Sequence, residues 1–160
     1  MKILSKETYM DKSEWARGEW DDEPDRIEWR HEKEPHFPCL IVRNVLGSLC
    51  GYVGVNESHA YYEKDCDEVV AIDVHGGITF SDRCRKGSNI GPTPLENESD
   101  KVWWLGFHCA HWDDVQPYFG KIMRADFPEV TYKNIDYVIA EINSLAEQLA
   151  PIKEDKNDVD

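Results

Sequence analysis

The feature that most constrains the fold is an apolar stripe near the end of the chain with the spacing of an α-helix. Between Tyr132 and Leu149 the apolar residues that follow a 3.6-residue period are Ile135, Val138, Ile139, Ile142, Leu145, Ala146 and Leu149. A helix of this kind is stable when its apolar face packs on another layer of the protein. We expect Thr131 to cap its start and Pro151 to end it. The rest of the chain must therefore supply an apolar layer.

Extended segments in the middle of the chain can form that layer. The apolar runs Pro38–Arg43 and Leu49–Val55 flank a polar segment at 44–48, which predicts a buried hairpin. Residues 25–30 alternate polar and apolar side chains, as a half-buried strand does. The most hydrophobic segment is 101–110, which we expect to lie in the interior of the sheet.

A further strand is expected before a glycine pair. Residues 69–75 form a mostly β-branched run that ends at Gly76 and Gly77, and 78–81 follow as a short extended segment. Together these elements predict an α+β fold, in which a mainly antiparallel sheet carries the C-terminal amphipathic helix packed on it.

The domain organisation is expected to be simple, since 160 residues suit one hydrophobic core. We assign 1–24 to a polar, acidic and irregular N-terminal arm, 25–150 to a single α+β domain, and 151–160 to a disordered charged tail. Residues 82–100 contain two glycines and two prolines and predict a long exposed loop.

Composition excludes several classes of protein. A formal net charge of −14 disfavours direct binding to nucleic acid, which requires a Lys/Arg surface. No apolar run reaches the length of a membrane span, and the first residues become polar too early for a secretory signal, so a cytoplasmic location without a membrane partner is expected. Five cysteines without a CxxC pair indicate free thiols, and Cys39, Cys50 and Cys109 lie in apolar runs as small hydrophobic residues.

One polar and aromatic constellation could form a binding site. It lies after the expected strand at 69–75 and along and beyond the expected strand at 101–110. Its members are His75, Gly76, Gly77, Thr79, Ser81, Trp104, His108, His111 and Asp113. Aromatic faces beside glycines and directional polar groups are typical of pockets that stack a base and bind ribose or phosphate. We therefore expect Trp104 and His75 to share one pocket. We assign no catalytic residue, metal or other cofactor to it. We expect the C-terminal helix to be purely structural.

Two alternatives remain open. Histidines and carboxylates are metal ligands, so His75, His111 and Asp113 could serve a metal-dependent hydrolase of a small phosphorylated or nucleotide substrate. Their spacing matches no standard signature such as HExxH. In the other alternative the protein is an acidic protein-binding inhibitor, with the aromatic and acidic segment 14–29 as its contact surface.

Three motifs give the chain a resemblance to an uncharacterised family of small phage and prophage proteins. They are Cys-Gly-Tyr-Val-Gly-Val at 50–55, His-Gly-Gly at 75–77, and Trp-Trp-Leu-Gly-Phe-His-Cys-Ala-His at 103–111. The resemblance implies a phage accessory protein in the cytoplasm of a bacterial host, where it would counteract host defence. The expected partner is then a small nucleotide-like molecule or a host defence protein, and a homo-oligomer is possible.

Overall fold

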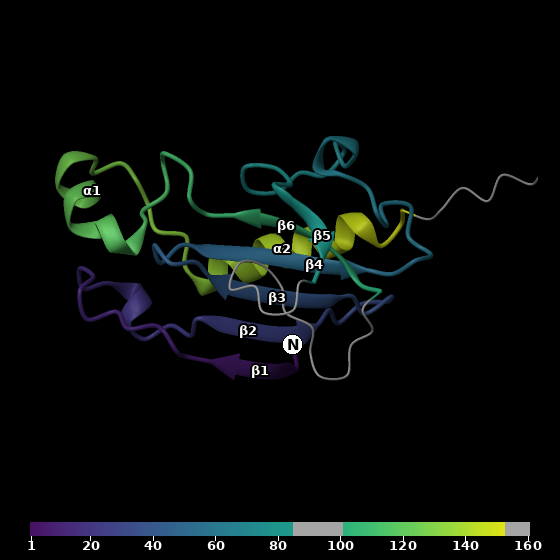
Figure 1. Ribbon diagram of the computed structural model, residues 1–160, viewed down its shortest axis with the longest axis horizontal. Helices are drawn as coiled ribbons and strands as arrows, with labels where there is room; N and C mark the ends of the chain where they lie inside the picture. Colours follow the sequence, from purple (N-terminus) through teal and green to yellow (C-terminus); the bar gives the residue numbers. More distant parts are fainter. Residues whose placement is uncertain (85–100, 153–160) are drawn as a thin grey trace, which may run out of the picture.

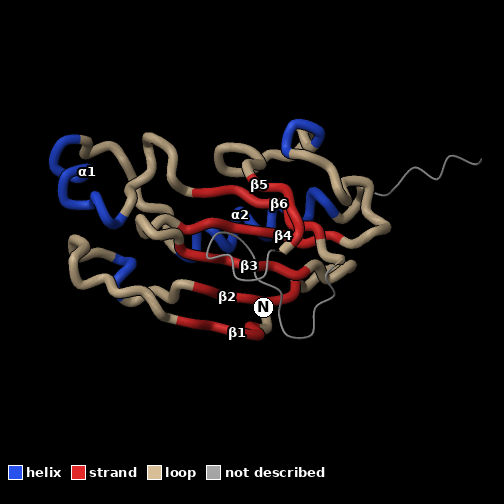
Figure 2. The backbone as a smooth tube through the Cα atoms, in the orientation of Figure 1, coloured by secondary structure: helices blue, strands red, loops and turns tan. Residues whose placement is uncertain are grey.

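The computed structural model describes residues 1–84 and 101–152, which form an α+β fold as the sequence predicts. Their strands make one antiparallel sheet of order β1-β2-β3-β4-β6-β5, and helix α2 lies along one face of it (Figures 1 and 2). The bounds are β1 Ile3–Glu7, β2 Arg26–Arg30, β3 Pro38–Arg43, β4 Leu49–Val55, β5 Phe80–Arg83, β6 Trp103–His108, α1 Gly120–Asp126 and α2 Ile135–Leu149. Short 3-10 helices are η1 Glu19–Asp21, η2 Cys66–Glu68 and η3 Pro117–Phe119.

The predicted hairpin and the predicted interior strand are confirmed. Strands β3 and β4 pair with Ile41 opposite Gly51, and β6 pairs with β4 on one side and β5 on the other. The hairpin turn is held by the Asn44 side chain, which accepts hydrogen bonds of 3.0 Å from the backbone N–H groups of Leu46 and Ser48. Most of the predicted loop, residues 85–100, and the tail from 153 onward lie outside the described residues.

The sheet has an apolar side chain layer on each face. Alternate residues of the strands face α2, and with the helix they form the main core, which includes Ile27, Trp29, Ile41, Val53, Leu105, Phe107, Val138, Ile142 and Leu145. The intervening residues Leu40, Val42, Tyr52 and Trp104 form a second cluster without any α2 residue. This cluster therefore lies on the sheet face away from α2.

Helix α2 confirms the predicted amphipathic helix but begins with a different cap. The side chain of Asn134 accepts the hydrogen bond from the backbone N–H of Tyr137 at 3.0 Å, so the expectation that Thr131 caps the helix is wrong. Thr131 instead pairs with Asp114 in an isolated β-bridge, three residues before the cap. The apolar stripe packs on the sheet as expected, with Val138, Ile142 and Leu145 fully buried.

The segment before the glycine pair is not a strand, contrary to our expectation. Of its apolar residues Val69 and Val74 are buried, whereas Val70 is exposed. Its backbone bonds to side chains of α2: the N–H of Asp73 donates to Gln148 Oε1 at 2.8 Å, and Gln148 Nε2 donates to the carbonyl of Asp73 at 2.7 Å. These contacts satisfy the backbone groups that a neighbouring strand would otherwise pair.

The N-terminal arm is also more ordered than the sequence predicts. Strand β1 pairs with β2 and forms one edge of the sheet. Behind it, Trp15 and Trp20 are buried against Val115 and Val130 in a small separate core. The 3-10 helix at 19–21 and helix α1 at 120–126 flank this core, so two segments far apart in the chain pack together.

A buried ionic network ties the arm to the sheet. The guanidinium of Arg43, whose side chain is 0% exposed, donates to Asp25 Oδ1 at 2.9 Å and to Glu23 Oε2 at 3.0 Å. It also donates to the carbonyl of Gly47 at 2.8 Å and to the hydroxyl of Tyr132 at 2.7 Å, while that hydroxyl donates to Glu23 at 2.6 Å. The charge of Arg43 is thus fully partnered inside the protein.

Asp25 receives further hydrogen bonds from the arm itself. Its Oδ2 accepts from the backbone N–H groups of Tyr9 and Met10 at 2.8 Å, and Lys12 Nζ lies 3.0 Å from Oδ1. Burial alone would raise the pKa of Asp25, but the hydrogen bonds from Met10, Tyr9 and Lys12 outweigh it and hold the pKa below its usual value. The carboxylate is therefore charged at neutral pH and anchors the arm.

Candidate functional site

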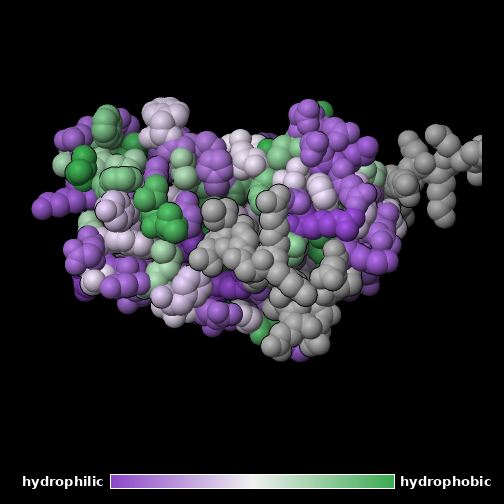
Figure 3. All heavy atoms as spheres, viewed as in Figure 1, coloured by the Kyte–Doolittle hydropathy of each residue, from purple (hydrophilic) through white to green (hydrophobic). Residues whose placement is uncertain are grey.

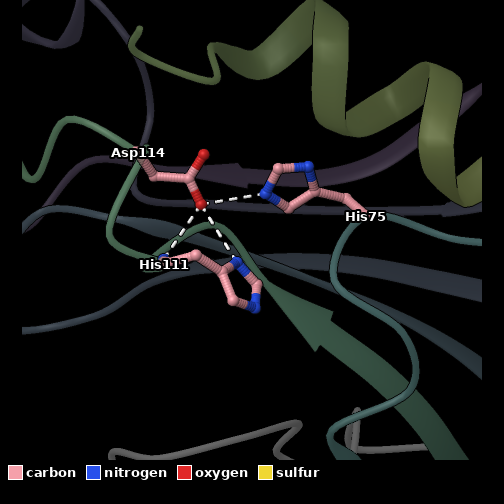
Figure 4. Close-up of side chains that lie close together, drawn as sticks. All are labelled: His75, His111 and Asp114. Atoms are coloured by element: carbon pink, nitrogen blue, oxygen red, sulfur yellow. Dashed lines mark hydrogen bonds and ion pairs between the residues drawn. The ribbon is translucent and has the colours of Figure 1, made fainter. Parts of the chain in front are cut away.

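Two loops bring a cluster of polar side chains together beside the end of strand β6. His75 comes from the loop before β5, and His111 and Asp114 come from the turn that follows β6 (Figure 4). One nitrogen of each imidazole and one oxygen of the carboxylate lie within 4.8 Å of one another. Figure 4 shows both histidines directed toward the same carboxylate oxygen.

Asp114 is the centre of the cluster. Its Oδ2 lies 2.8 Å from His75 Nε2 and 3.1 Å from His111 Nδ1, and it accepts a hydrogen bond of 3.0 Å from the backbone N–H of His111. Lys133 Nζ lies 3.2 Å from the other oxygen, Oδ1, as an ion pair without hydrogen-bond geometry. A fully buried carboxylate is therefore surrounded by two imidazoles and one ammonium group.

The surroundings of Asp114 keep it ionised. Burial raises the pKa of this carboxyl, but the hydrogen bonds from His75 and from the backbone and side chain of His111 outweigh burial and lower the pKa below its usual value. A carboxylate accepts hydrogen bonds and does not donate them, so in this state each ring nitrogen that faces Oδ2 carries its proton. The charge of Asp114 thus selects the tautomer of both rings.

Helix α2 takes part in the site, contrary to our expectation that it is purely structural. The hydroxyl of Tyr137 lies 2.9 Å from His75 Nδ1, and Glu141 Oε2 accepts the backbone N–H of His75 at 2.7 Å. A phenol can donate or accept, so Tyr137 supports either tautomer of His75. His75 is thus held on both sides, by Asp114 at one ring nitrogen and by α2 at the other.

A third histidine extends the cluster along β6. The ring of His108 stacks on that of His111, with centroids 4.6 Å apart and an interplanar angle of 15°. Its Nδ1 lies 2.8 Å from Thr79 Oγ1. Burial and the neighbouring His111 lower the pKa of His108, which favours the neutral imidazole.

The glycine pair has a direct structural role in the site. Gly76 has a φ of +68°, and a Cβ atom there would lie 2.1 Å from Cε1 and 2.3 Å from Nε2 of His111. Gly77 has a φ of +81°, but a Cβ there would meet no atom within 4 Å. Gly76 therefore allows the His75 loop to approach His111, whereas Gly77 serves only the turn.

This difference predicts unequal effects of two matched substitutions. Gly76→Ala should destabilise the protein by roughly 1–3 kcal/mol more than Gly77→Ala, because both add strain at positive φ but only the first also collides with a ring. Urea unfolding of both variants measures the difference. Equal losses of stability would contradict the close approach of the loop to His111.

The structure gathers only part of the site that the sequence predicts. It brings together His75, Gly76, Thr79, His108 and His111, with Gly77 beside them.

Three predicted members do not join the cluster. Trp104 packs on the sheet face away from α2, whereas His75 bonds to α2, so the prediction that they share a pocket is wrong. Ser81 accepts a hydrogen bond of 3.3 Å from Cys66 Sγ, in another part of the sheet edge. Asp113 is exposed, and its neighbour Asp114 is the buried carboxylate, because the turn after β6 directs Asp114 inward.

Sequence reasoning missed the contributions of Asp114, Lys133, Tyr137 and Glu141. A usable signal was the position of Asp114 three residues after His111, because an aspartate in a turn can accept the backbone N–H groups near it. The three α2-region residues carry no such local signal. Tyr137 and Glu141 reach the site because α2 packs across the sheet beside the His75 loop, whereas Lys133 lies just before the helix and is held there by the bridge between Asp114 and Thr131.

Comparisons with known proteins add no assignment. No family model matches the chain, and no curated protein or solved structure is similar to it. The resemblance to a phage and prophage family therefore stays a prediction. Among the helices within residues 1–84 and 101–152, none is long and apolar enough to cross a membrane.

Proposed function

We propose that the protein is a metal-dependent hydrolase whose divalent ion is bound by His75, His111 and Asp114. The observation that carries this proposal is the convergence of two imidazole nitrogens and a buried carboxylate oxygen within 4.8 Å. Catalytic zinc sites use three protein ligands of this kind and leave a position for water. The proposal replaces Asp113, the carboxylate expected from the sequence, with Asp114.

An ion at Asp114 would require small outward shifts of the ligating atoms. With metal–ligand bonds of about 2.0–2.2 Å in a tetrahedral site, neighbouring donor atoms on one ion lie roughly 3.3–3.6 Å apart. Oδ2 is 2.8 Å from His75 Nε2 and 3.1 Å from His111 Nδ1. The two ring nitrogens lie within 4.8 Å of each other, and His111, whose side chain is 27% exposed against 12% for His75, is the ligand with more room to turn.

Metal binding is also compatible with the positions of the protons on the two imidazole rings. The two ring nitrogens that face Asp114 must lose their protons to bind an ion, which moves each ring to its other tautomer. The Tyr137 hydroxyl can accept the N–H that then forms on His75 Nδ1. A partner of this kind on the far side of a ligating histidine orients the ring and strengthens its binding.

A bound divalent ion would supply hydrolytic chemistry at the open position. Held by His75, His111 and Asp114, such an ion would lower the pKa of its bound water to about 7 and so supply a hydroxide nucleophile for hydrolysis of an ester or phosphoester. His108 is the further imidazole beside these ligands, since its ring stacks on that of His111 with centroids 4.6 Å apart.

The other two expectations lead to weaker proposals. A nucleotide base stacked on Trp104 has no support at this site, because Trp104 lies on the other face of the sheet. Figure 3 shows apolar colour at the end of the molecule that carries α1. A host protein could use exposed apolar side chains in and around α1, which are Tyr118, Phe119, Ile122 and Phe127, or Trp112 in the turn after β6. Their exposure supports an interaction without identifying its partner.

The decisive experiment measures metal binding by calorimetry and elemental analysis. We expect the wild-type protein to bind one zinc ion per chain, and Asp114→Asn and His111→Gln to weaken binding by at least about 100-fold, since even partners outside the ligand set change affinity about 10–100-fold. The Zn²⁺-loaded protein should hydrolyse 4-nitrophenyl phosphate, and EDTA should abolish this activity.

Asp113→Asn is the matched control, since it removes an adjacent exposed carboxylate and should leave binding unchanged. Circular dichroism of each variant separates loss of the site from loss of the fold. Wild-type protein that binds no ion, or binds it equally well after Asp114→Asn in a folded variant, would refute the proposed metal site.

A further inference from the structure

We infer that this site takes an oxyanion substrate of the phosphate class, and that Lys133 binds the anion together with the metal ion. This inference rests on the proposed metal site. It deepens the proposal by naming the substrate class and the residue that recognises it. The observation behind it is that the ammonium group of Lys133 lies beside Asp114, the carboxylate that would also bind the ion.

Lys133 is held next to Asp114 by local structure. Its Nζ lies 3.2 Å from Asp114 Oδ1 and 2.5 Å from Thr131 Oγ1, and 5.7 Å from the centroid of the Tyr137 ring. The backbone fixes this arrangement, because Asp114 and Thr131 form a β-bridge and the N–H of Val115 donates to the carbonyl of Thr131 at 2.9 Å. The ammonium group is thus placed by the same element that places the carboxylate.

Metal binding changes what the ammonium group can do. Without an ion, Lys133 is the cation that neutralises Asp114 at Oδ1. A divalent ion at Oδ2 satisfies the same carboxylate and repels the ammonium at its other end. Lys133, whose side chain is 15% exposed and which also bonds to Thr131 Oγ1, would then turn toward an anion held by the ion.

The charge of the whole protein makes such a local cation favourable for binding an anion. Asp and Glu number 32 against 18 Lys and Arg, so the surface field repels phosphate at a distance. A doubly charged ion and an ammonium group a few ångströms apart reverse that field at one point. Two adjacent cations of this kind match the several oxygens of a phosphoryl group better than they match a single neutral carbonyl.

The test uses inorganic phosphate as the probe, titrated into zinc-loaded protein in the calorimeter at constant ionic strength. Lys133→Met should weaken phosphate binding at least about tenfold, as expected for loss of one charge-assisted hydrogen bond. Its zinc stoichiometry should stay at one per chain, and Lys133→Arg should recover part of the affinity. Lys121→Met removes an exposed lysine of α1 and should change nothing.

The outcomes separate this inference from the proposal on which it rests. Wild-type protein that binds no zinc overturns both. Zinc-loaded wild-type protein that does not bind phosphate, or binds it as tightly after Lys133→Met, overturns the oxyanion inference and leaves the metal site standing. Loss of zinc from Lys133→Met would show that the lysine supports the metal ligands and does not recognise substrate.

Discussion

Replacement of Arg43 by methionine is expected to lower the free energy of unfolding by about 3–5 kcal/mol, the cost of leaving buried charges without their partner. Methionine fills similar volume, so the main loss is electrostatic. Asp25 and the partly buried Glu23 would lose the guanidinium that bonds to both, and Lys12 would remain as a cation beside Asp25. Urea unfolding followed by circular dichroism measures the change.

Arg17→Met is the control for this prediction. The Arg17 side chain is 94% exposed, and its ion pair with Asp21 lies at the surface, so the change in stability should stay within about 0.5 kcal/mol. A loss below about 1 kcal/mol for Arg43→Met would mean that the network contributes little to stability. The arm would then be held mainly by the small apolar core around Trp20.

Replacement of Ile142 by alanine is expected to cost about 2–5 kcal/mol, through lost burial and the cavity that remains. Ile142 is fully buried at the centre of the contact between α2 and the sheet. It fills the space over Gly51, where an added Cβ would lie 2.9 Å from Ile142 and 2.6 Å from Phe107. Backbone and helix meet closely at this point, so neighbouring atoms have little freedom to close the gap.

Ile122→Ala provides the same chemical change on the surface. Ile122 is 62% exposed on α1, so its replacement should alter stability by no more than about 0.5 kcal/mol. Thermal and urea unfolding of both variants give the comparison. Similar small losses for both would show that α2 packs more loosely on the sheet than these contacts imply.

The parts of the fold that the sequence predicts are those that local patterns determine. The hairpin around Asn44 follows from two apolar runs and a polar turn, and the α2 helix follows from its 3.6-residue stripe. Strand β1 carries no comparable pattern, because an edge strand with mostly exposed side chains needs no apolar alternation. The run at 69–75 has the composition of a strand, but α2 side chains occupy its backbone groups instead.

The sequence predicts the histidines of the candidate site but not its carboxylate. His75 and His111 stand out because imidazoles are few and both follow apolar segments. Asp113 and Asp114 are adjacent in a turn, and the local backbone geometry decides which of them points inward. The periodicity of the sequence does not show that geometry. Tyr137 and Glu141 join the site through the packing of α2, and a residue of an amphipathic helix looks the same in sequence whether it faces solvent or a loop. Lys133 joins it through the bridge between Asp114 and Thr131, which pairs two separate segments of the chain.

Contacts of Arg43 and Tyr132 join parts of the chain that lie far apart: these two are 89 positions apart in the sequence, and Glu23 and Tyr132 are 109 positions apart. Contacts across such separations require large loops to close and tend to form late in folding. Interactions that are absent from the folding transition state act on the unfolding rate and leave the folding rate almost unchanged. Stopped-flow kinetics of Arg43→Met should therefore show faster unfolding with folding little altered. The buried network would thus determine how long the folded chain persists, while the hairpin and helix determine how quickly it forms.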